Sequence, residues 1–137
     1  KEATGKWAHY PAAAGAGTTV WLLVDAPELK AGLRHLGGEP RALHLYAQPG
    51  AAGDVAAAWT ETLGDRALVL PQAEAVRRDY FGPVDPRVIG RIGDVVVICT
   101  DGFAVVDSET ESASALALIG HHGATTAREL EIPLLVV

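Results

Sequence analysis

The segment of residues 41–70, RALHLYAQPGAAGDVAAAWTETLGDRALVL, contains the patterns that decide the fold. Within residues 41–48, the side chains of Ala42, His44 and Tyr46 alternate with those of Leu43, Leu45 and Ala47, which predicts a β-strand. In residues 54–63 the apolar side chains recur at spacings of three and four, which predicts an amphipathic helix. Residues 67–70 form a short apolar run that is typical of a second strand. The segment therefore predicts a strand, a helix and a strand in succession.

Residues that favour turns and helix ends mark the limits of these elements. Pro49-Gly50 closes the first strand, Asp54 is placed to cap the helix, and Gly64 is placed to end it. Trp59 falls on the apolar face of the helix, and we expect it to pack in the core.

Upstream of this segment the sequence predicts one short helix. Asp25-Ala26-Pro27-Glu28 supplies a capping residue, a first-turn proline and an acidic first turn. We expect the helix to run through Leu33 and to be ended by Gly37-Gly38. Residues 20–24 form a short apolar run, and residues 1–19 are predicted to be an irregular lead-in.

Downstream, the sequence predicts a second helix and a hairpin. Residues 72–78 have a helical pattern, and the β-branched residues of 95–100 favour a strand. Asp101-Gly102 is a strong hairpin signal, so residues 103–106 are predicted to pair with residues 95–100. The polar, acidic residues 107–114 are predicted to form a surface loop.

The order of these elements indicates a mixed α/β (α+β) fold. Residues from about 40 to 106 follow the order strand, helix, strand, helix, hairpin, which predicts an α/β subdomain able to bury its own core. After it we expect a helix that starts at Thr125 or Thr126, and then a final apolar run over residues 133–137. A chain of 137 residues has the length of one ordinary domain.

Composition excludes several classes of partner. The formal charge is −6 and no Lys/Arg cluster is present, so we expect no nucleic-acid polymer as partner. No run approaches the length of roughly 18 apolar residues that spans a bilayer, and the start lacks a secretory signal pattern. We therefore expect no membrane partner and a soluble chain, cytoplasmic rather than secreted. The one cysteine, Cys99, lies in an apolar run and is expected to be an inert core thiol.

A sequence that contains no methionine and starts at Lys1 is expected to be a piece of a longer gene product. Such a piece can lack residues that its parent needs for function.

Potential chemistry is concentrated in residues 120–126, Gly-His-His-Gly-Ala-Thr-Thr. Two adjacent histidines between glycines can approach a metal closely, because glycine allows tight turns and neutral imidazole is a common zinc ligand. By spacing alone, a solvated surface pair is the more frequent explanation of such a motif. The residues by themselves therefore leave both interpretations open.

Longer stretches of the chain resemble a known family. Residues 91–97 and 118–136 look like the C-terminal end of bacterial type I phosphodiesterase/nucleotide pyrophosphatase proteins, in the alkaline phosphatase superfamily. The family pattern is a strand, a loop, Gly-x-His-Gly-Ser-Leu-Thr, an acidic residue and Pro-Leu-Leu. Residues 38–46 and 59–70 resemble the segment that precedes this motif in the family. The resemblance covers roughly residues 20–137 and implies part of an alkaline-phosphatase-like α/β fold, with residues 40–106 as an inserted strand-helix-strand subdomain.

The resemblance implies a metal ligand at His122, because the family's histidine directly before the glycine binds one of two zinc ions. His121 occupies a variable place and has no implied role. Ala124 and Thr125 stand where Ser-Leu is usual, which departs from the motif but keeps its ligand. Glu129 falls near the usual acidic position.

The remaining machinery of the family is absent from residues 1–137. Family members bring a catalytic threonine or serine, several aspartates and an Asp-His-Gly motif from earlier in the chain. The implied partner is therefore the N-terminal part of the same catalytic domain, and the implied substrate is a small phosphodiester or nucleotide. Catalytic zinc sites use about three protein ligands per metal, so this chain alone is expected to be inactive.

One alternative is weighed beside this hypothesis. The chain could be a non-catalytic α/β cap or protein-interaction subdomain, since the elements of residues 40–106 can form their own core. The other polar side chains are first explained by structural or solvated positions: His9, His35, His44, Asp94, Asp101, Asp107, Glu109 and Glu111.

Overall fold

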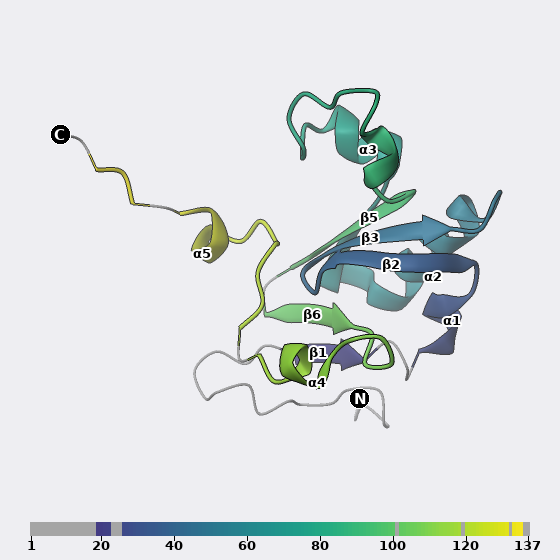
Figure 1. The fold of residues 1–137 in the computed structure, drawn as a ribbon, viewed down its shortest axis with the longest axis horizontal. Coiled ribbons are helices and arrows are strands. Elements are labelled where there is room, and N and C mark those ends of the chain that lie inside the picture. Colours follow the sequence, from purple (N-terminus) through teal and green to yellow (C-terminus); the bar gives the residue numbers. More distant parts are fainter. Residues whose placement is uncertain (1–18, 23–25, 101, 119, 132, 136–137) are drawn as a thin grey trace.

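The computed structural model describes residues 19–22, 26–100, 102–118, 120–131 and 133–135 (Figure 1). The strands are β1 (Thr19–Leu22), β2 (Leu33–Glu39), β3 (Ala42–Ala47), β4 (Ala67–Pro71), β5 (Val95–Cys99) and β6 (Phe103–Val106). The α-helices are α1 (Pro27–Lys30), α2 (Ala52–Leu63), α3 (Gln72–Arg77), α4 (Ala113–Leu116) and α5 (Ala127–Leu130), with short 3-10 turns at Gly64–Arg66 and Ile89–Arg91. The mixed α/β class predicted from the sequence is confirmed.

A four-stranded antiparallel sheet with the order β2-β3-β5-β4 forms the centre of the molecule. Strand β5 lies between β3 and β4, so that Val97 is paired with Leu43 on one side and with Val69 on the other. All five residues of β5 are buried, as expected for a central strand covered on both faces.

Helix α2 packs on one face of this sheet and makes the main core. Its buried residues Val55, Trp59 and Leu63 lie in one apolar cluster with Leu45 and Val97 of the sheet. Trp59 is fully buried, and its indole N–H donates to the Leu29 carbonyl at 2.9 Å. That bond satisfies the polar group of the largest core side chain and ties α1 to the core. The core position predicted for Trp59 is confirmed.

A second apolar cluster covers the opposite face of the sheet. Leu70 and Val96 project into it from the sheet, Ala75 enters from α3, and Ile92 precedes β5. Ala124 joins this cluster from far along the chain. The histidine-containing loop is therefore packed against the sheet.

The predicted hairpin between residues 95–100 and 103–106 is wrong. Strand β6 pairs in parallel with β1, with Val20 opposite Ala104, and the two make a separate sheet. Strand β5 cannot accept β6 because β3 and β4 already occupy both of its edges. One bond that holds β6 beside the larger sheet runs from the Val105 N–H to the Pro40 carbonyl, in the turn between β2 and β3, at 2.8 Å. Asp101 lies outside the described residues.

The predicted extent of the first helix is also wrong. Helix α1 ends at Lys30, and Leu33 begins strand β2, with Gly37-Gly38 inside that strand. When residues 33–39 pair with β3, Leu33 and Leu36 pack against the main core. This packing stabilises a strand in preference to a longer helix. A register irregularity between Leu33 and His35 places these two leucines, three residues apart, on one face.

The predictions for the central segment are confirmed, with small changes at the ends. Strands β3 and β4 and helices α2 and α3 lie where their patterns place them. Gly64 ends α2 with a φ of 58°, as predicted, whereas Asp54 lies in the first turn and Ala51 is the N-cap residue. Strand β2, at residues 33–39, belongs to the same sheet as β3, β4 and β5, whereas β6 at residues 103–106 does not.

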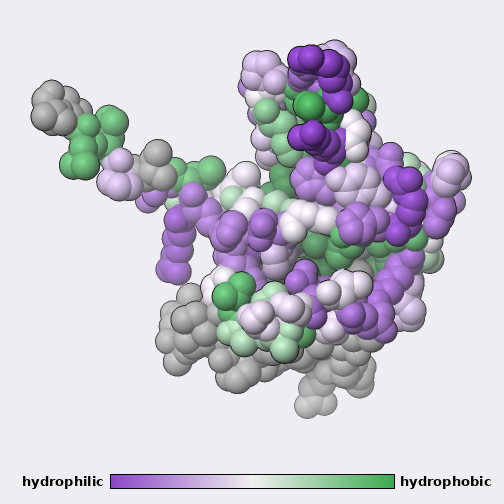
Figure 2. Space-filling model, viewed as in Figure 1, coloured by the Kyte–Doolittle hydropathy of each residue, from purple (hydrophilic) through white to green (hydrophobic). Residues whose placement is uncertain are grey.

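The C-terminal part extends away from the sheet. Helix α5 begins after Thr126, as predicted, and residues 133–135 lead outward from the body (Figure 1). Leu134 and Leu135 are 86% and 87% exposed. Figure 2 shows hydrophobic surface along this arm. Residues 107–114 are predicted from the sequence to be a surface loop, but helix α4 begins within them, at Ala113. The irregular lead-in predicted for residues 1–19 falls outside the described residues, except that Thr19 begins β1.

Among the described residues, each helix is too short or too polar to cross a bilayer.

Candidate functional site

The loop of residues 120–126, which we call the histidine loop, lies between α4 and α5. It crosses the turn between β2 and β3 at Gly123, whose φ is +110°. A Cβ atom on Gly123 would lie 3.1 Å from the Ala42 Cβ and 3.3 Å from the Glu39 Cβ. Both the left-handed backbone and the close approach require glycine here.

Glu129 fixes the second half of the histidine loop. Its carboxylate accepts a hydrogen bond from the Ala124 N–H at 3.1 Å and one from the Thr126 hydroxyl at 2.6 Å. Thr126 is the N-cap residue of α5, but its hydroxyl bonds to the Glu129 side chain and does not cap the helix backbone. Ala124 is 5% exposed and packs in the second apolar cluster. The end of the loop is therefore held by both polar and apolar contacts.

Arg41 connects this loop to the sheet. Its guanidinium donates from Nε to Glu129 Oε1 and from Nη2 to Glu129 Oε2, both at 3.0 Å, in a two-pronged ion pair. A third bond runs from Nη1 to the Phe103 carbonyl at 2.7 Å. Arg41 is 4% exposed, so an unpaired charge there would carry a large desolvation cost. The Arg41 hydrogen bonds lower the pKa of Glu129 to about 2, which keeps the carboxylate ionised.

The two histidines differ in their surroundings. The side chain of His122 is exposed, and within the described part of the chain it makes no hydrogen bond or ion pair. His121 is half-buried, and burial lowers the pKa of its imidazole below the ordinary value. The positive charge of Arg41 adds to that shift, while the Glu39 carboxylate opposes it. His121 therefore tends to be neutral, and His122 is the more accessible of the two rings.

In the histidine loop, the side chains that could bind a metal are the imidazole rings of His121 and His122. In the ranges that the structure describes, no group of three or more His, Cys, Asp or Glu side chains is placed to hold a metal ion. A tetrahedral or catalytic zinc site needs about three protein ligands. His122 fits the role of one ligand among several, and the others would have to come from outside the described residues.

No protein-family model matches the sequence, and no curated protein matches it.

Two other histidines, His35 and His44, lie in strands of the main sheet. His35 lies in β2 with its ring centroid 5.6 Å from that of Tyr46, and not at a helix end as predicted. His44 lies in β3, where its Nδ1 accepts the Gly93 N–H at 3.0 Å and its ring is 5.6 Å from Phe81. Burial lowers the pKa of His44, in keeping with an acceptor nitrogen in a neutral ring. His9 lies outside the described residues.

Three acidic side chains considered in the sequence analysis, those of Asp94, Asp107 and Glu109, form hydrogen bonds or ion pairs within the fold. Asp94 accepts the Ala47 N–H at 2.8 Å, a bond to the end of β3 and not within its own turn. Asp107 is 9% exposed and pairs with Lys30, which departs from the solvated loop expected for residues 107–114. Lys30 also pairs with Glu109 of the same loop.

Two features of the site were missed by sequence reasoning. The bond from the Thr126 hydroxyl to the Glu129 carboxylate joins residues three apart, so the Thr-x-x-Glu spacing in the sequence could have indicated a contact between them. The pairing of Glu129 with Arg41 has no local signal, because the two residues are 88 positions apart. Only the fold brings them together.

Proposed function

We propose that this chain is the C-terminal part of a zinc-dependent phosphodiesterase or nucleotide pyrophosphatase-like hydrolase, to which it contributes the metal ligand His122. One structural observation carries the proposal beyond the sequence resemblance. The exposed His122 ring sits on a loop whose base is fixed by Gly123, Ala124 and the Arg41–Glu129 pair. A ligand loop held in this way can present an imidazole to a metal without first being ordered.

The rest of the metal site belongs to the N-terminal part of the same catalytic domain. One imidazole is too few for catalytic zinc, so the aspartate and further histidine ligands would have to come from that part, together with the threonine or serine nucleophile. When bound, a pair of zinc ions stabilises the charge that develops as a phosphodiester or nucleotide pyrophosphate is cleaved. On this proposal the present chain alone is inactive.

Exposed leucines support the existence of such a partner. Leu118, before the histidine loop, is 59% exposed, and Leu130 in α5 is 61% exposed. The two leucines of the C-terminal arm are more exposed still. Exposed apolar side chains such as these are available for contact with a protein segment that covers them. Here they precede and follow His122 in the sequence.

The decisive experiment compares the two histidines in the full-length gene product. His122→Ala should weaken zinc binding by more than about 100-fold, since groups that merely orient metal ligands are worth about 10–100-fold. His121→Ala changes the neighbouring residue in the same way and should bind zinc nearly as the unaltered protein does. Zinc affinity by competition with a chelator, and hydrolysis of bis(p-nitrophenyl) phosphate, are the measurements. Equal losses in both variants would refute the assignment of His122.

A second candidate function rests on the main core. Helix α2 and the sheet β2-β3-β5-β4 bury Trp59, Leu45 and Val97 without any contribution from the histidine loop. This favours a non-catalytic α/β module that covers a substrate site or binds a protein. The discriminating assay measures zinc binding and hydrolysis after the chain is mixed with the separately expressed N-terminal part. Recovery of both activities supports the hydrolase, and a folded mixture with neither supports the module.

A further inference from the structure

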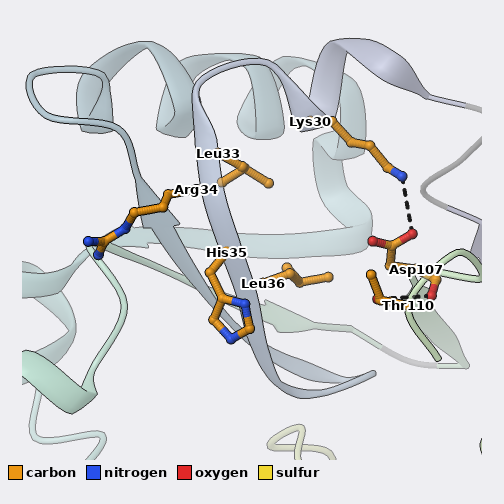
Figure 3. A pocket seen from close by; sticks show the side chains of 7 residues that line it. All are labelled: Lys30, Leu33, Arg34, His35, Leu36, Asp107 and Thr110. Carbon is orange, nitrogen blue, oxygen red and sulfur yellow. Dashed lines mark hydrogen bonds and ion pairs between the residues drawn. The ribbon is translucent and has the colours of Figure 1, made fainter. Parts of the chain in front are cut away.

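A pocket of about 240 Å³ lies between strand β2 and the loop that follows β6 (Figure 3). Lys30 of α1, Leu33 and Leu36 of β2, and Asp107 of the loop are among its lining residues. No residue of the histidine loop lines it. The pocket is thus a separate feature from the proposed metal ligand.

One wall of the pocket carries an ion pair with unused bonding capacity. The Lys30 ammonium lies 3.2 Å from Asp107 Oδ1 and also pairs with Glu109. The hydrogen bond with Glu109 is the main cause of a raised pKa at Lys30, which therefore stays cationic. An ammonium group has three N–H donors. Among the described residues Lys30 has these two acceptors, so one donor remains for a ligand.

The Asp107 carboxylate has an oxygen without a partner. Oδ1 accepts from Lys30 and from the Glu109 N–H, whereas Oδ2 accepts no hydrogen bond from any residue in the described ranges. Asp107 is only 9% exposed, and buried carboxylate oxygens are normally satisfied by a donor. Figure 3 shows this second oxygen on the side of Leu36, and both residues line the pocket. The oxygen is therefore placed to receive a donor from a bound molecule.

The facing side of the pocket is apolar. Leu33 and Leu36 are half-buried, and in Figure 3 both side chains point toward Lys30 and Asp107. Arg34, between them in the sequence, points in the opposite direction. The pocket thus offers an acceptor and a donor side by side, with two leucine side chains across from them.

We propose that this pocket binds a small zwitterion of amino-acid size with an apolar side chain. The ligand ammonium group donates to Asp107 Oδ2, its carboxylate accepts from the free N–H of Lys30, and its side chain lies on Leu33 and Leu36. The 3.2 Å between the Lys30 and Asp107 charges is similar to the short separation of the two charged groups of an α-amino acid. A zwitterion places opposite charge beside each member of the pair and adds no net charge to the pocket.

Ligands with a single charge fit less well. An anion of the same size would leave Asp107 Oδ2 unpaired and would face two carboxylates, those of Asp107 and Glu109. An amine would leave the Lys30 donor unused and would crowd its ammonium group. The volume of about 240 Å³ also suits a molecule of this size better than a nucleotide, since pockets for drug-sized ligands run from about 300 Å³ upward.

The test compares three molecules that share one side chain. Leucine is the zwitterion, isoamylamine lacks the carboxylate, and isovalerate lacks the ammonium group. We expect leucine to bind with a dissociation constant on the order of 1 mM, as suits so small a ligand, and each analogue to bind about ten-fold more weakly or worse. Binding is measured by saturation-transfer NMR and by amide shift changes, which should map to residues 30–36 and 107–110. Equal binding of either analogue overturns the proposal, as does an absence of binding by leucine at about 20 mM.

Variants give an independent check. Asp107→Asn and Lys30→Gln should each weaken leucine binding about ten-fold, because each removes one charged hydrogen bond. Arg128→Gln removes an exposed positive charge that does not line the pocket and serves as the matched control, with an expected change under about two-fold. A loss in the control as large as in the other two overturns the assignment. The comparison of ligands on the unaltered protein stands even if one variant fails to fold.

Discussion

Arg41 and Glu129, 88 positions apart, form a two-pronged ion pair with both N···O distances at 3.0 Å. The pair joins the start of β3 to helix α5, and its third bond, to the Phe103 carbonyl, extends the connection to β6. Three parts of the chain that have no local reason to meet are thereby held at one point. The histidine loop is anchored at that point, so the placement of His122 depends on the pair.

Removal of one partner of this pair should destabilise the protein strongly. Glu129→Gln leaves the buried Arg41 charge without a counter-charge, which we expect to lower the free energy of unfolding by about 3 kcal/mol. Urea unfolding followed by tryptophan fluorescence measures the change. Glu131→Gln makes the same change of charge at an exposed residue two positions away and should stay within about 0.5 kcal/mol of the unaltered protein. Similar losses in the two variants would contradict a special role for the pair.

The same pair should make stability depend on pH in the acid range. The hydrogen bonds from Arg41 lower the pKa of Glu129 from 4.5 to about 2. Because the folded value is below the unfolded one, the stabilisation is present above pH 4.5 and is lost as the pH falls from 4.5 toward 2. We expect Glu129→Gln to lose less stability over that interval than the unaltered protein does. Unfolding free energies measured at several pH values in both proteins test this, and parallel curves would contradict it.

Local patterns were sufficient to predict the centre of the fold. Helix α2 has a clear apolar stripe that ends at Gly64, and β5 is a continuous apolar run of buried-strand type. These signals are contained within one element each. The bond between the Thr126 and Glu129 side chains, three residues apart, is local in the same sense.

Features that depend on distant pairing could not be predicted. Asp101-Gly102 has the chemistry of a hairpin turn, but β3 and β4 already occupy both edges of β5, and β6 joins β1 instead. Residues 33–39 carry no strand alternation, and pairing with β3 decides their structure. The Arg41–Glu129 and Lys30–Asp107 pairs likewise join residues more than half a chain apart. In each case the structure depends on a residue or strand that lies far away in the sequence.

Cys99 should be almost unreactive in the folded chain. Burial raises the pKa of its thiol to about 12, so that at pH 8 only about one thiol in ten thousand is the reactive thiolate. We expect reaction with 5,5′-dithiobis(2-nitrobenzoic acid) to be at least about 100-fold slower in buffer than in unfolding concentrations of urea. Absorbance at neutral to mildly basic pH follows the release of the aromatic thiol. Equal rates in the two conditions would show that the thiol is accessible.

The two glycines of the histidine motif should respond differently to the same substitution. Gly123→Ala puts a Cβ on a backbone with φ +110° and places it 3.1 Å from the Ala42 Cβ, so we expect a loss of about 1–3 kcal/mol in stability and a displaced loop. Gly120→Ala meets no atom within 4 Å and should change stability by less than about 0.5 kcal/mol. The imidazole NMR signals of His122 report on loop position independently of stability and should move only in Gly123→Ala. A shift of those signals in Gly120→Ala, with none in Gly123→Ala, would show that Gly123 does not set the position of His122.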